Sequence, residues 1–233
     1  MFSAVDRNDP DEIHPSLWRA SQLARGNGRS VETGYASLSA ELPGGGWPVG
    51  ALIELLPQHS GIGELRLLQP ALASLGKRPV GLIEPPHPLY GPGLGSIGLP
   101  LDAIVQIKAP RMADKLWAAE QILRTGSFGA LLLWLQQVPQ ASLRRLHLAA
   151  QSSETLFIVV RPEWAATQAS PATLRLGLRP AEDGLAIDIL KRRGPVAATP
   201  LAISVQQPVL HSRRRRARVP APITVSVEAA VEA

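Results

Sequence analysis

The segment from Ala51 to Leu72 reads ALIELLPQHSGIGELRLLQPAL, an apolar run followed by a glycine-bearing turn and an amphipathic run. A strand, turn and helix in this order can build a nucleotide-phosphate site, because N–H groups of the turn and of the helix N-terminus point at the phosphates. Such a loop also needs a lysine for the β- and γ-phosphates and a Ser or Thr for Mg²⁺. The chemistry of this turn therefore depends on whether it supplies those two side chains.

The turn supplies neither of them. The lysine position falls on Ile62 or Gly63, depending on the register, and the hydroxyl position falls on Gly63 or Glu64. Glu64 also places a carboxylate in the first helical turn, where the helix dipole would otherwise favour a phosphate. We predict a degenerate phosphate loop made of Ser60, Gly61, Ile62, Gly63 and Glu64, in which Glu64 stabilises its own helix rather than serving a metal or a reaction.

Two acidic positions of a nucleotide hydrolase are missing as well. The strand GALLLWL should end in a Mg²⁺-binding acid, but Trp134 stands at that place. The strand GLIE should be followed by a water-activating glutamate, yet the only acid there is Glu84, and Pro85, Pro86 and His87 come next. These losses predict that the protein is not an enzyme, binds no nucleotide tightly and uses no cofactor.

Other reactive residue types form no recognisable site. The chain has no cysteine, which excludes disulfides, thiol nucleophiles and cysteine zinc sites. The five histidines lack the spacing of metal ligands, so we expect no bound metal. His59 and Ser60 are adjacent, but no Gly-x-Ser-x-Gly elbow surrounds them, which argues against a hydrolase.

Nothing in the sequence indicates a membrane or an export route. The longest apolar run, ALLLWL, is far too short to cross a bilayer. The first fifteen residues contain Asp and Glu where a signal peptide has basic and then apolar residues. We therefore expect a cytoplasmic protein, associated with the nucleoid when it is active.

The net charge of +5 is concentrated near the C-terminus. Five arginines in the run HSRRRRAR carry it, and the rest of the chain is neutral, since 5 − 5 = 0. This run could bind DNA phosphates without sequence readout or could contact an acidic protein, and it has no aromatic residues for stacking on single strands. The candidate DNA-binding residues are Arg213, Arg214, Arg215, Arg216 and Arg218.

Strands and helices alternate through the middle of the chain. The predicted elements are strands at 51–56, 79–84, 103–109, 129–135 and 155–161, helices at 63–75, 112–124 and 141–151, and two alternating strands at 172–180 and 184–194. Runs that are apolar on both faces indicate central strands covered by helices, whereas the last two strands, joined by AEDG, indicate an antiparallel hairpin. This order predicts a doubly wound α/β fold with a mostly parallel sheet and a C-terminal antiparallel hairpin.

Composition divides the chain into three parts. We expect an N-terminal helix and linker over residues 1–30, a core domain over 31–205 and a flexible basic tail over 206–233.

Four tryptophans have distinct expected roles. Trp18 on the N-terminal helix and Trp47 after three glycines are candidate anchors for a partner, because exposed tryptophans concentrate interface energy. Trp117 and Trp134 lie in amphipathic or apolar runs, and we expect both to fill the core.

Several motifs agree in order with one family. TGYASLSAELPGGGWPVGALIELL resembles the run before the phosphate loop of RecA-type recombinases, and GLIEPPHPLYGPGLGSIGLPLDAIVQIKA and ADKLWAAEQILRTGSFGALLLWL follow in the recombinase order. The chain resembles the ImuA proteins in the segments LPGGGWPVGALIEL, GIGELRLL, LWAAEQIL and DILKRRGP. ImuA proteins are RecA-like proteins that are also similar to the SulA division inhibitors. The resemblance covers roughly residues 13–195 and implies a RecA-like fold without ATPase activity.

This resemblance also implies a function and a set of partners. ImuA proteins act in the SOS response to DNA damage, in induced mutagenesis by translesion synthesis. The implied partners are an ImuB-type inactive Y-family polymerase and an error-prone DnaE-type polymerase, with RecA as a further candidate. We therefore expect a non-catalytic accessory protein or scaffold of this DNA repair complex. The alternative is a SulA-type SOS inhibitor of cell division that binds the tubulin-like division protein, and a residual ATPase comes third.

Overall fold

The computed structural model describes residues 29–89, 91–96, 99, 101–194, 199–205 and 222–227. Its elements are β1 (Ser30–Glu32), α3 (Ala36–Glu41), β2 (Gly46–Pro48), β3 (Leu52–Pro57), α4 (Glu64–Ser74), β4 (Val80–Ile83), α5 (Gly91–Ser96), η1 (Leu101–Ala103), β5 (Ile104–Lys108), α6 (Met112–Thr125), β6 (Ala130–Trp134), α7 (Gln140–Gln151), β7 (Leu156–Val160), η2 (Glu163–Thr167), β8 (Leu174–Ala181), β9 (Gly184–Lys191), β10 (Leu201–Ser204) and β11 (Ile223–Ser226). None of the helices in this part of the chain has the length and apolarity that a membrane crossing requires.

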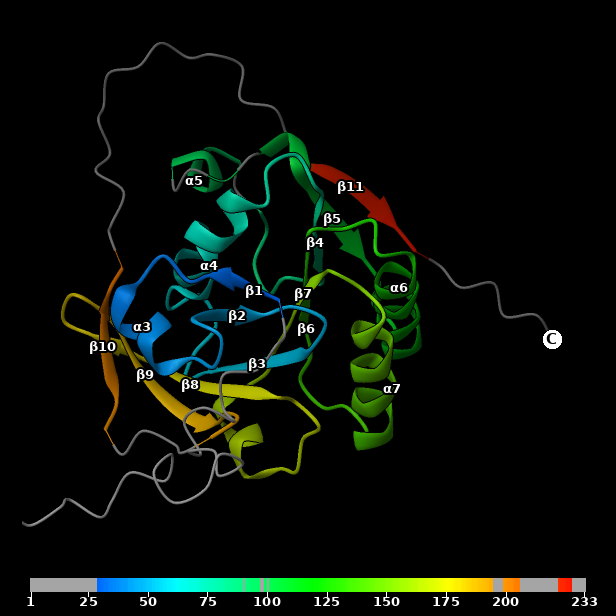
Figure 1. Ribbon diagram of the computed structural model, residues 1–233. Coiled ribbons are helices and arrows are strands. Elements are labelled where there is room, and N and C mark those ends of the chain that lie inside the picture. The colour runs from blue at the N-terminus through cyan, green and yellow to red at the C-terminus, as the bar shows by residue number, and fades with distance from the viewer. Residues whose placement is uncertain are drawn as a thin grey trace, which may run out of the picture.

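Nine of the described strands form one sheet, with helices on both of its faces (Figure 1). The strand order is β10-β9-β8-β3-β7-β6-β4-β5-β11. The neighbours from β8 to β11 in this order run parallel, and β9 pairs antiparallel with β8 and β10. The prediction of a mixed α/β fold with a mostly parallel sheet and a C-terminal hairpin is therefore confirmed.

The central strands are apolar throughout because both faces of the sheet are covered. Successive side chains of a strand point to opposite faces. On β6, Leu132 and Trp134 belong to the cluster that α4 packs against, whereas Leu131 and Leu133 belong to the cluster formed with α6 and α7. The two clusters lie on opposite sides of the sheet, so alternate residues of one apolar strand fill two cores.

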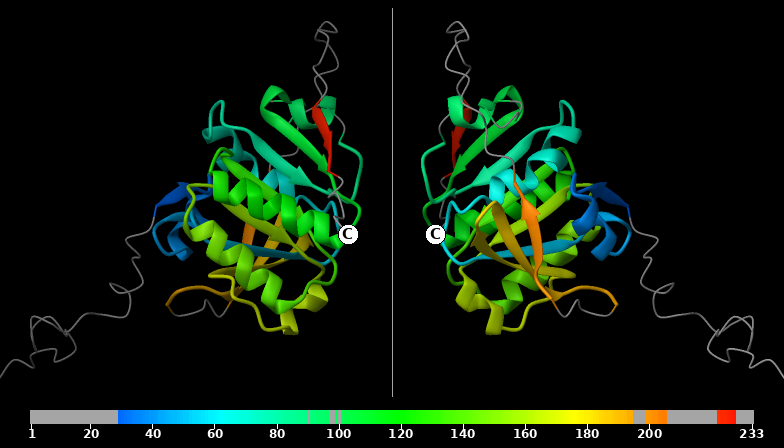
Figure 2. Two further views of the ribbon diagram at one scale, coloured as in Figure 1. Left: turned by 90° about the vertical axis from the view of Figure 1, so that its right-hand side faces the viewer. Right: turned by 90° about the vertical axis from the view of Figure 1, so that its left-hand side faces the viewer.

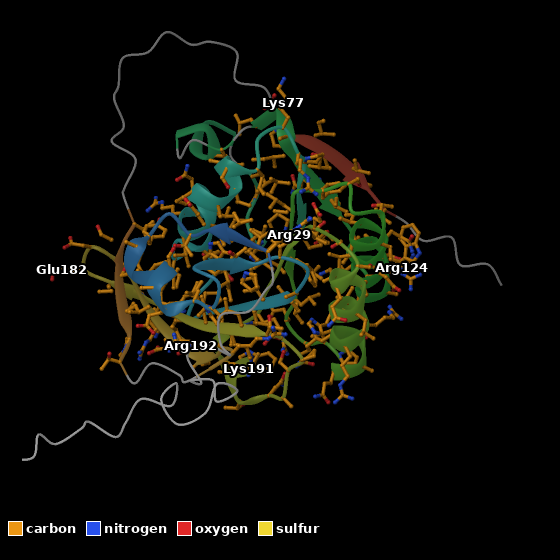
Figure 3. All side chains as sticks on the ribbon, viewed as in Figure 1. Arg29, Lys77, Arg124, Glu182, Lys191 and Arg192 are labelled. Atoms are coloured by element: carbon orange, nitrogen blue, oxygen red, sulfur yellow. The ribbon has the colours of Figure 1, made fainter. Side chains whose placement is uncertain are left out.

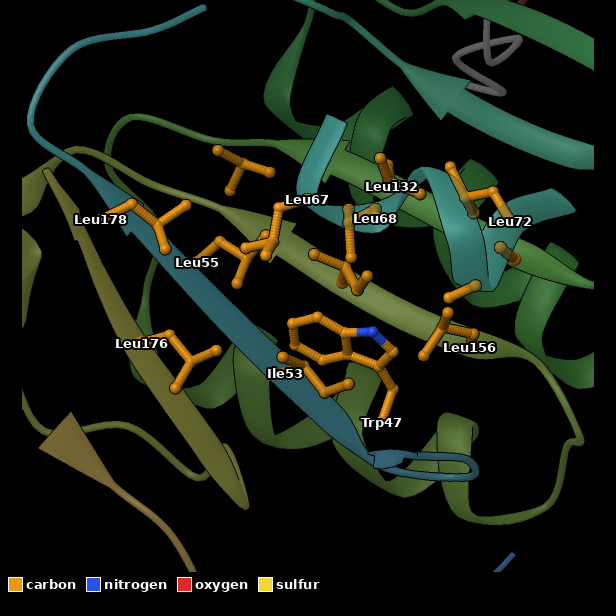
Figure 4. Close-up of a cluster of buried hydrophobic side chains, with 14 of the residues drawn as sticks. Trp47, Ile53, Leu55, Leu67, Leu68, Leu72, Leu132, Leu156, Leu176 and Leu178 are labelled. Atoms are coloured by element: carbon orange, nitrogen blue, oxygen red, sulfur yellow. The ribbon is translucent and has the colours of Figure 1, made fainter. Parts of the chain in front are cut away.

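Trp47 on β2 is fully buried, with 0% of its surface exposed, so the prediction that it anchors a partner is wrong. Pairing of β2 with the short strand β1 holds it over the α4 side of the sheet. Its ring packs among Ile53, Leu55, Leu67 and Leu68 of β3 and α4 (Figure 4). The indole ring buries more apolar area than a smaller side chain would, and this buried area stabilises the core.

Trp117 and Trp134 have opposite environments. Trp134 is 8% exposed on β6, which confirms its expected place in the core. Trp117 is 50% exposed, so the expectation that it fills the core is wrong. The reason is helical phase, because Leu116, Ala119 and Leu123 form the stripe of α6 that faces the sheet, and Trp117 lies outside that stripe.

A close approach explains why the chain has a glycine at position 34. Gly34 has a φ of 82°, and a Cβ atom there would lie 2.3 Å from Cβ of Pro70 in α4. A residue with a side chain would therefore be strained by its backbone and would collide with the proline ring. Gly34 lets the segment between β1 and α3 pass directly against α4.

The tail predicted over residues 206–233 contains a strand that the sequence reading did not anticipate. Residues 223–226 form β11, which pairs in parallel with β5 at the edge of the sheet. The segment reads ITVS, and β-branched residues of this kind favour a strand beside an open sheet edge. Residues 206–221 and 228–233 lie outside the described part of the chain. The proposed N-terminal helix, with Trp18, also lies outside it. The three-part division therefore stays a prediction for those residues.

Candidate functional site

The loop between β3 and α4 lies at the carboxyl ends of the parallel strands. In open α/β sheets this edge is where ligands usually bind. The segment after β4 and the end of β6 border the same place, where they enclose a cavity of about 310 Å³. Its lining includes Gly61, Glu64, Arg66, His87, Leu89 and Trp134.

Glu64 occupies the N–H groups that an anion would use in this loop. The backbone N–H of Gly61 donates to Oε1 of Glu64 over 3.0 Å, and the N–H of Gly63 donates to Oε2 over 3.2 Å. Both glycines have positive φ, 84° and 130°, which lets the backbone curl around the carboxylate. Glu64 is only 4% exposed. An incoming phosphate would therefore have to displace the Glu64 carboxylate, which is also negative and already accepts these hydrogen bonds.

The two other positions that a nucleotide hydrolase would use have structural roles. Trp134 ends β6 and forms part of the cavity wall, so an indole takes the place of the Mg²⁺-binding carboxylate of a nucleotide hydrolase. Glu84 follows β4 with an unusual positive φ of 50°. Its Oε1 accepts a hydrogen bond of 2.7 Å from the N–H of Ala109, and its own N–H donates to the carbonyl of Ile107. Glu84 thus ties β4 to the end of β5.

The cavity is built to hold apolar groups. Three prolines and three leucines contribute to its wall together with Trp134. His87 lies beside Gly61, since a Cβ on that glycine would be 3.4 Å from Nε2 of the histidine. Of the predicted loop residues, Ser60 is exposed, Ile62 packs against the core, and Glu64 is already bonded. The arrangement suits an apolar side chain better than a charged phosphate.

The sequence reading missed a buried ion cluster at the centre of the fold. Glu54 of β3 is 0% exposed, and its carboxylate accepts from Nη1 of Arg161 over 3.1 Å and from Nε of Arg175 over 2.6 Å. Arg161 also donates to Gln168, and Arg175 donates to the carbonyl of Ala165. The cluster joins β3, β8, η2 and the residue that directly follows β7. The signal that could have indicated it is a charged residue inside or directly after an apolar run, namely Glu54 within β3, Arg161 directly after β7 and Arg175 near the start of β8.

A second cavity, of about 390 Å³, lies near the start of β3 and was also missed. Nδ1 of His147 accepts a hydrogen bond of 3.3 Å from the N–H of Leu52, which requires a neutral ring at that nitrogen. Burial lowers the pKa of His147 below its ordinary value, and the charge of Lys191 lowers it further. At the rim, Arg29 pairs with Glu154. The site therefore favours an uncharged histidine.

The remaining predicted site residues lie outside the described part of the chain. These are Trp18 and the arginine run Arg213, Arg214, Arg215, Arg216 and Arg218. Their roles as partner anchor and DNA contact stay predictions. The structure therefore brings Gly61, Gly63 and Glu64 of the loop to the same cavity as Trp134. Glu84 is bonded to Ala109 instead, and Trp47 lies in the core, away from this site.

Comparisons with known proteins identify relatives of this chain. A sequence model of the family described as "Cell division inhibitor SulA" matches residues 54–157. SulA of Pectobacterium atrosepticum is 35% identical over 106 residues, which are 44% of this chain and 63% of that protein. SulA of Yersinia enterocolitica is 30% identical over 131 residues, which are 54% of this chain and 78% of that protein.

A solved structure is also similar. The crystal structure of SulA from Pseudomonas aeruginosa aligns with a TM-score of 0.40 and 28% identity, covering 47% of this chain and 97% of that chain. The chain spans between 59% and 63% of the length of the first three curated relatives that it matches. Because it also covers more than two thirds of the Yersinia enterocolitica protein at 30% identity, the chain belongs to the SulA family.

Proposed function

We propose that this protein is a non-catalytic, SOS-related inhibitor of cell division that acts by binding the tubulin-like division protein. Membership of the SulA family supports this function over the translesion role that the sequence motifs suggested first. On this proposal the domain is RecA-like, and the loop between β3 and α4 is a phosphate loop that has lost its chemistry.

One observation carries the non-catalytic part of the proposal. The carboxylate of Glu64 already accepts hydrogen bonds from the N–H groups of Gly61 and Gly63. A site whose anion-binding groups are satisfied from within gains little from binding ATP, because the incoming phosphate must replace a hydrogen-bonded charge. The protein would then work through its surface rather than through a reaction.

The test has a cellular and a purified part. Controlled expression in a rod-shaped bacterium should produce long cells without septa, whereas expression of the unfolded variant Leu132→Asp should not. The purified protein should lower the light scattering of polymerising division protein in proportion to its concentration. Normal cell length together with unchanged polymerisation would contradict the proposal.

A second candidate function is that of an accessory protein in translesion synthesis. It is favoured by the part of the chain after the family match, which ends at residue 157. The motif DILKRRGP begins there on β9, and the arginine run follows it in the sequence. The partners would be the ImuB-type and DnaE-type polymerases. Deletion of the gene would then lower the mutation frequency after ultraviolet irradiation without changing cell length, which separates the two candidates.

A further inference from the structure

Two large apolar side chains stand exposed on neighbouring helices. Trp117 of α6 is 50% exposed and Leu148 of α7 is 64% exposed. The two helices lie side by side on the outside of the sheet, as the left view of Figure 2 shows. Leaving two such side chains in water is unfavourable, and exposed apolar groups that gather on one surface mark interaction sites.

The exposed charged side chains of α6 and α7 are all positive. The acids of the two helices, Asp114 and Glu120, are buried and bonded to arginines. Three arginines remain on the outside, namely Arg124, Arg144 and Arg145. We call the surface made by Trp117, Gln121, Arg124, Arg144, Arg145 and Leu148 the α6–α7 face.

Glu120 holds two of these arginines in place. Its Oε1 accepts from Nη2 of Arg124 over 2.7 Å, and its Oε2 pairs with Nε of Arg145 across the helix contact over 2.9 Å. The side chains of Arg124 and Arg145 nevertheless remain 63% and 55% exposed. Their remaining N–H groups are thus oriented before any partner arrives, which reduces the entropy lost on binding.

We propose that the α6–α7 face binds a segment of a protein partner that carries both acidic and apolar side chains. The acidic groups would pair with the three arginines, and the apolar groups would cover Trp117 and Leu148. Tryptophan and arginine are the residue types that dominate protein interfaces. Single-stranded nucleic acid is disfavoured, because it needs a row of aromatic side chains along a groove and this face offers one tryptophan on two convex helices.

This inference rests on the proposed function only in that the protein acts by binding other proteins. A suitable probe is a fluorescently labelled 20-residue peptide with leucines at helical spacing and glutamates at the other positions. Its binding should weaken with increasing salt, and a peptide with lysine in place of glutamate should not bind. Arg144→Glu and Trp117→Ala should each weaken binding at least tenfold in fluorescence anisotropy.

Lys77→Glu is the matched control, because Lys77 is exposed and lies well away from Arg124 in Figure 3. This variant should bind the peptide within about twofold of the unaltered protein, since exposed charges beyond a Debye length of about 8–10 Å are largely screened. Thermal unfolding by circular dichroism should show that all three variants are folded. Equal binding by the face variants and the control would overturn the inference.

Three further outcomes test this inference, and the last two of them separate it from the proposed function. If a 20-nucleotide single strand binds more tightly than the peptide and depends on Trp117, the face binds nucleic acid and the inference is wrong. If the protein leaves division unaffected while peptide binding still depends on Arg144 and Trp117, the proposed function fails and the inference stands. If division inhibition survives in the face variants while peptide binding is lost, the face serves another protein partner.

Discussion

Glu54 of β3 and Arg175 of β8 are joined by a hydrogen bond of 2.6 Å inside the protein, although the two residues are 121 positions apart in the chain. Arg161, which directly follows β7, donates to the other oxygen of the carboxylate. Each parallel strand is hydrogen-bonded to its neighbour through the backbone, and this cluster adds a side-chain link across β7, β3 and β8. The low dielectric of the protein interior strengthens the attraction between this carboxylate and the two buried guanidinium groups.

We expect Glu54→Ala to destabilise the fold by about 3–5 kcal/mol, because it leaves two arginines buried without their counter-charge. Urea unfolding followed by circular dichroism measures the change. Asp188→Ala is the control, since it breaks the partly exposed pair with Arg179 and should cost about 0–1 kcal/mol. Equal losses for the two variants would mean that the buried cluster contributes no more than a surface pair.

The protein should not bind ATP with micromolar affinity, and it should not hydrolyse it, because its loop offers neither lysine nor a free N–H pair at Gly61 and Gly63. Isothermal calorimetry with ATP and Mg²⁺ checks binding, and phosphate release checks hydrolysis. Glu64→Ala should lower stability by about 1–3 kcal/mol, since it leaves N–H groups without their acceptor. Glu64→Gln keeps an acceptor oxygen and should cost less. Micromolar binding that is lost on altering residues 62–64 would contradict the prediction.

Stability should fall as the pH drops below about 6.5, the ordinary pKa of histidine. The pKa of His147 is lowered in the folded protein, so the unfolded chain takes up this proton at a higher pH than the folded protein does. Its stabilising contribution is therefore complete above the unfolded pKa and is lost as the pH falls toward the folded pKa. His147→Gln should remove this part of the pH dependence.

Urea unfolding of both proteins between pH 8 and pH 5 measures that dependence. The difference between the two free energies of unfolding should shrink on acidification. All other residues are the same in both proteins, so their contributions cancel in the comparison. A difference that stays constant over this range would show that His147 does not titrate as the structure indicates.

Nonspecific binding to duplex DNA should depend on the five arginines between residues 213 and 218. With at most five phosphate contacts, the slope of log K against log salt should be no steeper than about −4.5. Replacing all five by serine is a sharper test than truncation, because a chain ending near Gln207 would also lose β11. The variant Lys191→Ser, Arg192→Ser, Arg193→Ser is the control. Undiminished DNA affinity in the five-serine variant would contradict the prediction and would show that residues outside this arginine run contact DNA.

The order of strands and helices could be read from the sequence because it depends on local patterns. The run at 129–135 is apolar on both faces and became β6, and the repeat of leucines at 65, 68, 72 and 75 indicated α4. Apolar periodicity is a property of neighbouring residues, so no knowledge of the rest of the fold is needed to see it. The loss of the lysine, the hydroxyl and the strand-end acid was visible in the same way.

What the sequence could not show is which distant groups meet. Trp47 is buried and Trp117 is exposed, the opposite of what their local sequence predicts. Their burial depends on the pairing of β1 with β2 and on the phase of α6 against the sheet. Strand β11 follows a basic run and forms because the edge of β5 is open to it. The sequence by itself determined the order of the strands and helices from β3 to β9 and the lack of a lysine, a hydroxyl and a strand-end acid at the places where a phosphate site would need them. Only the tertiary structure decided that Glu54 would be shared by two arginines and that Trp117 would face outward, because both depend on contacts between strands and helices far apart in the chain.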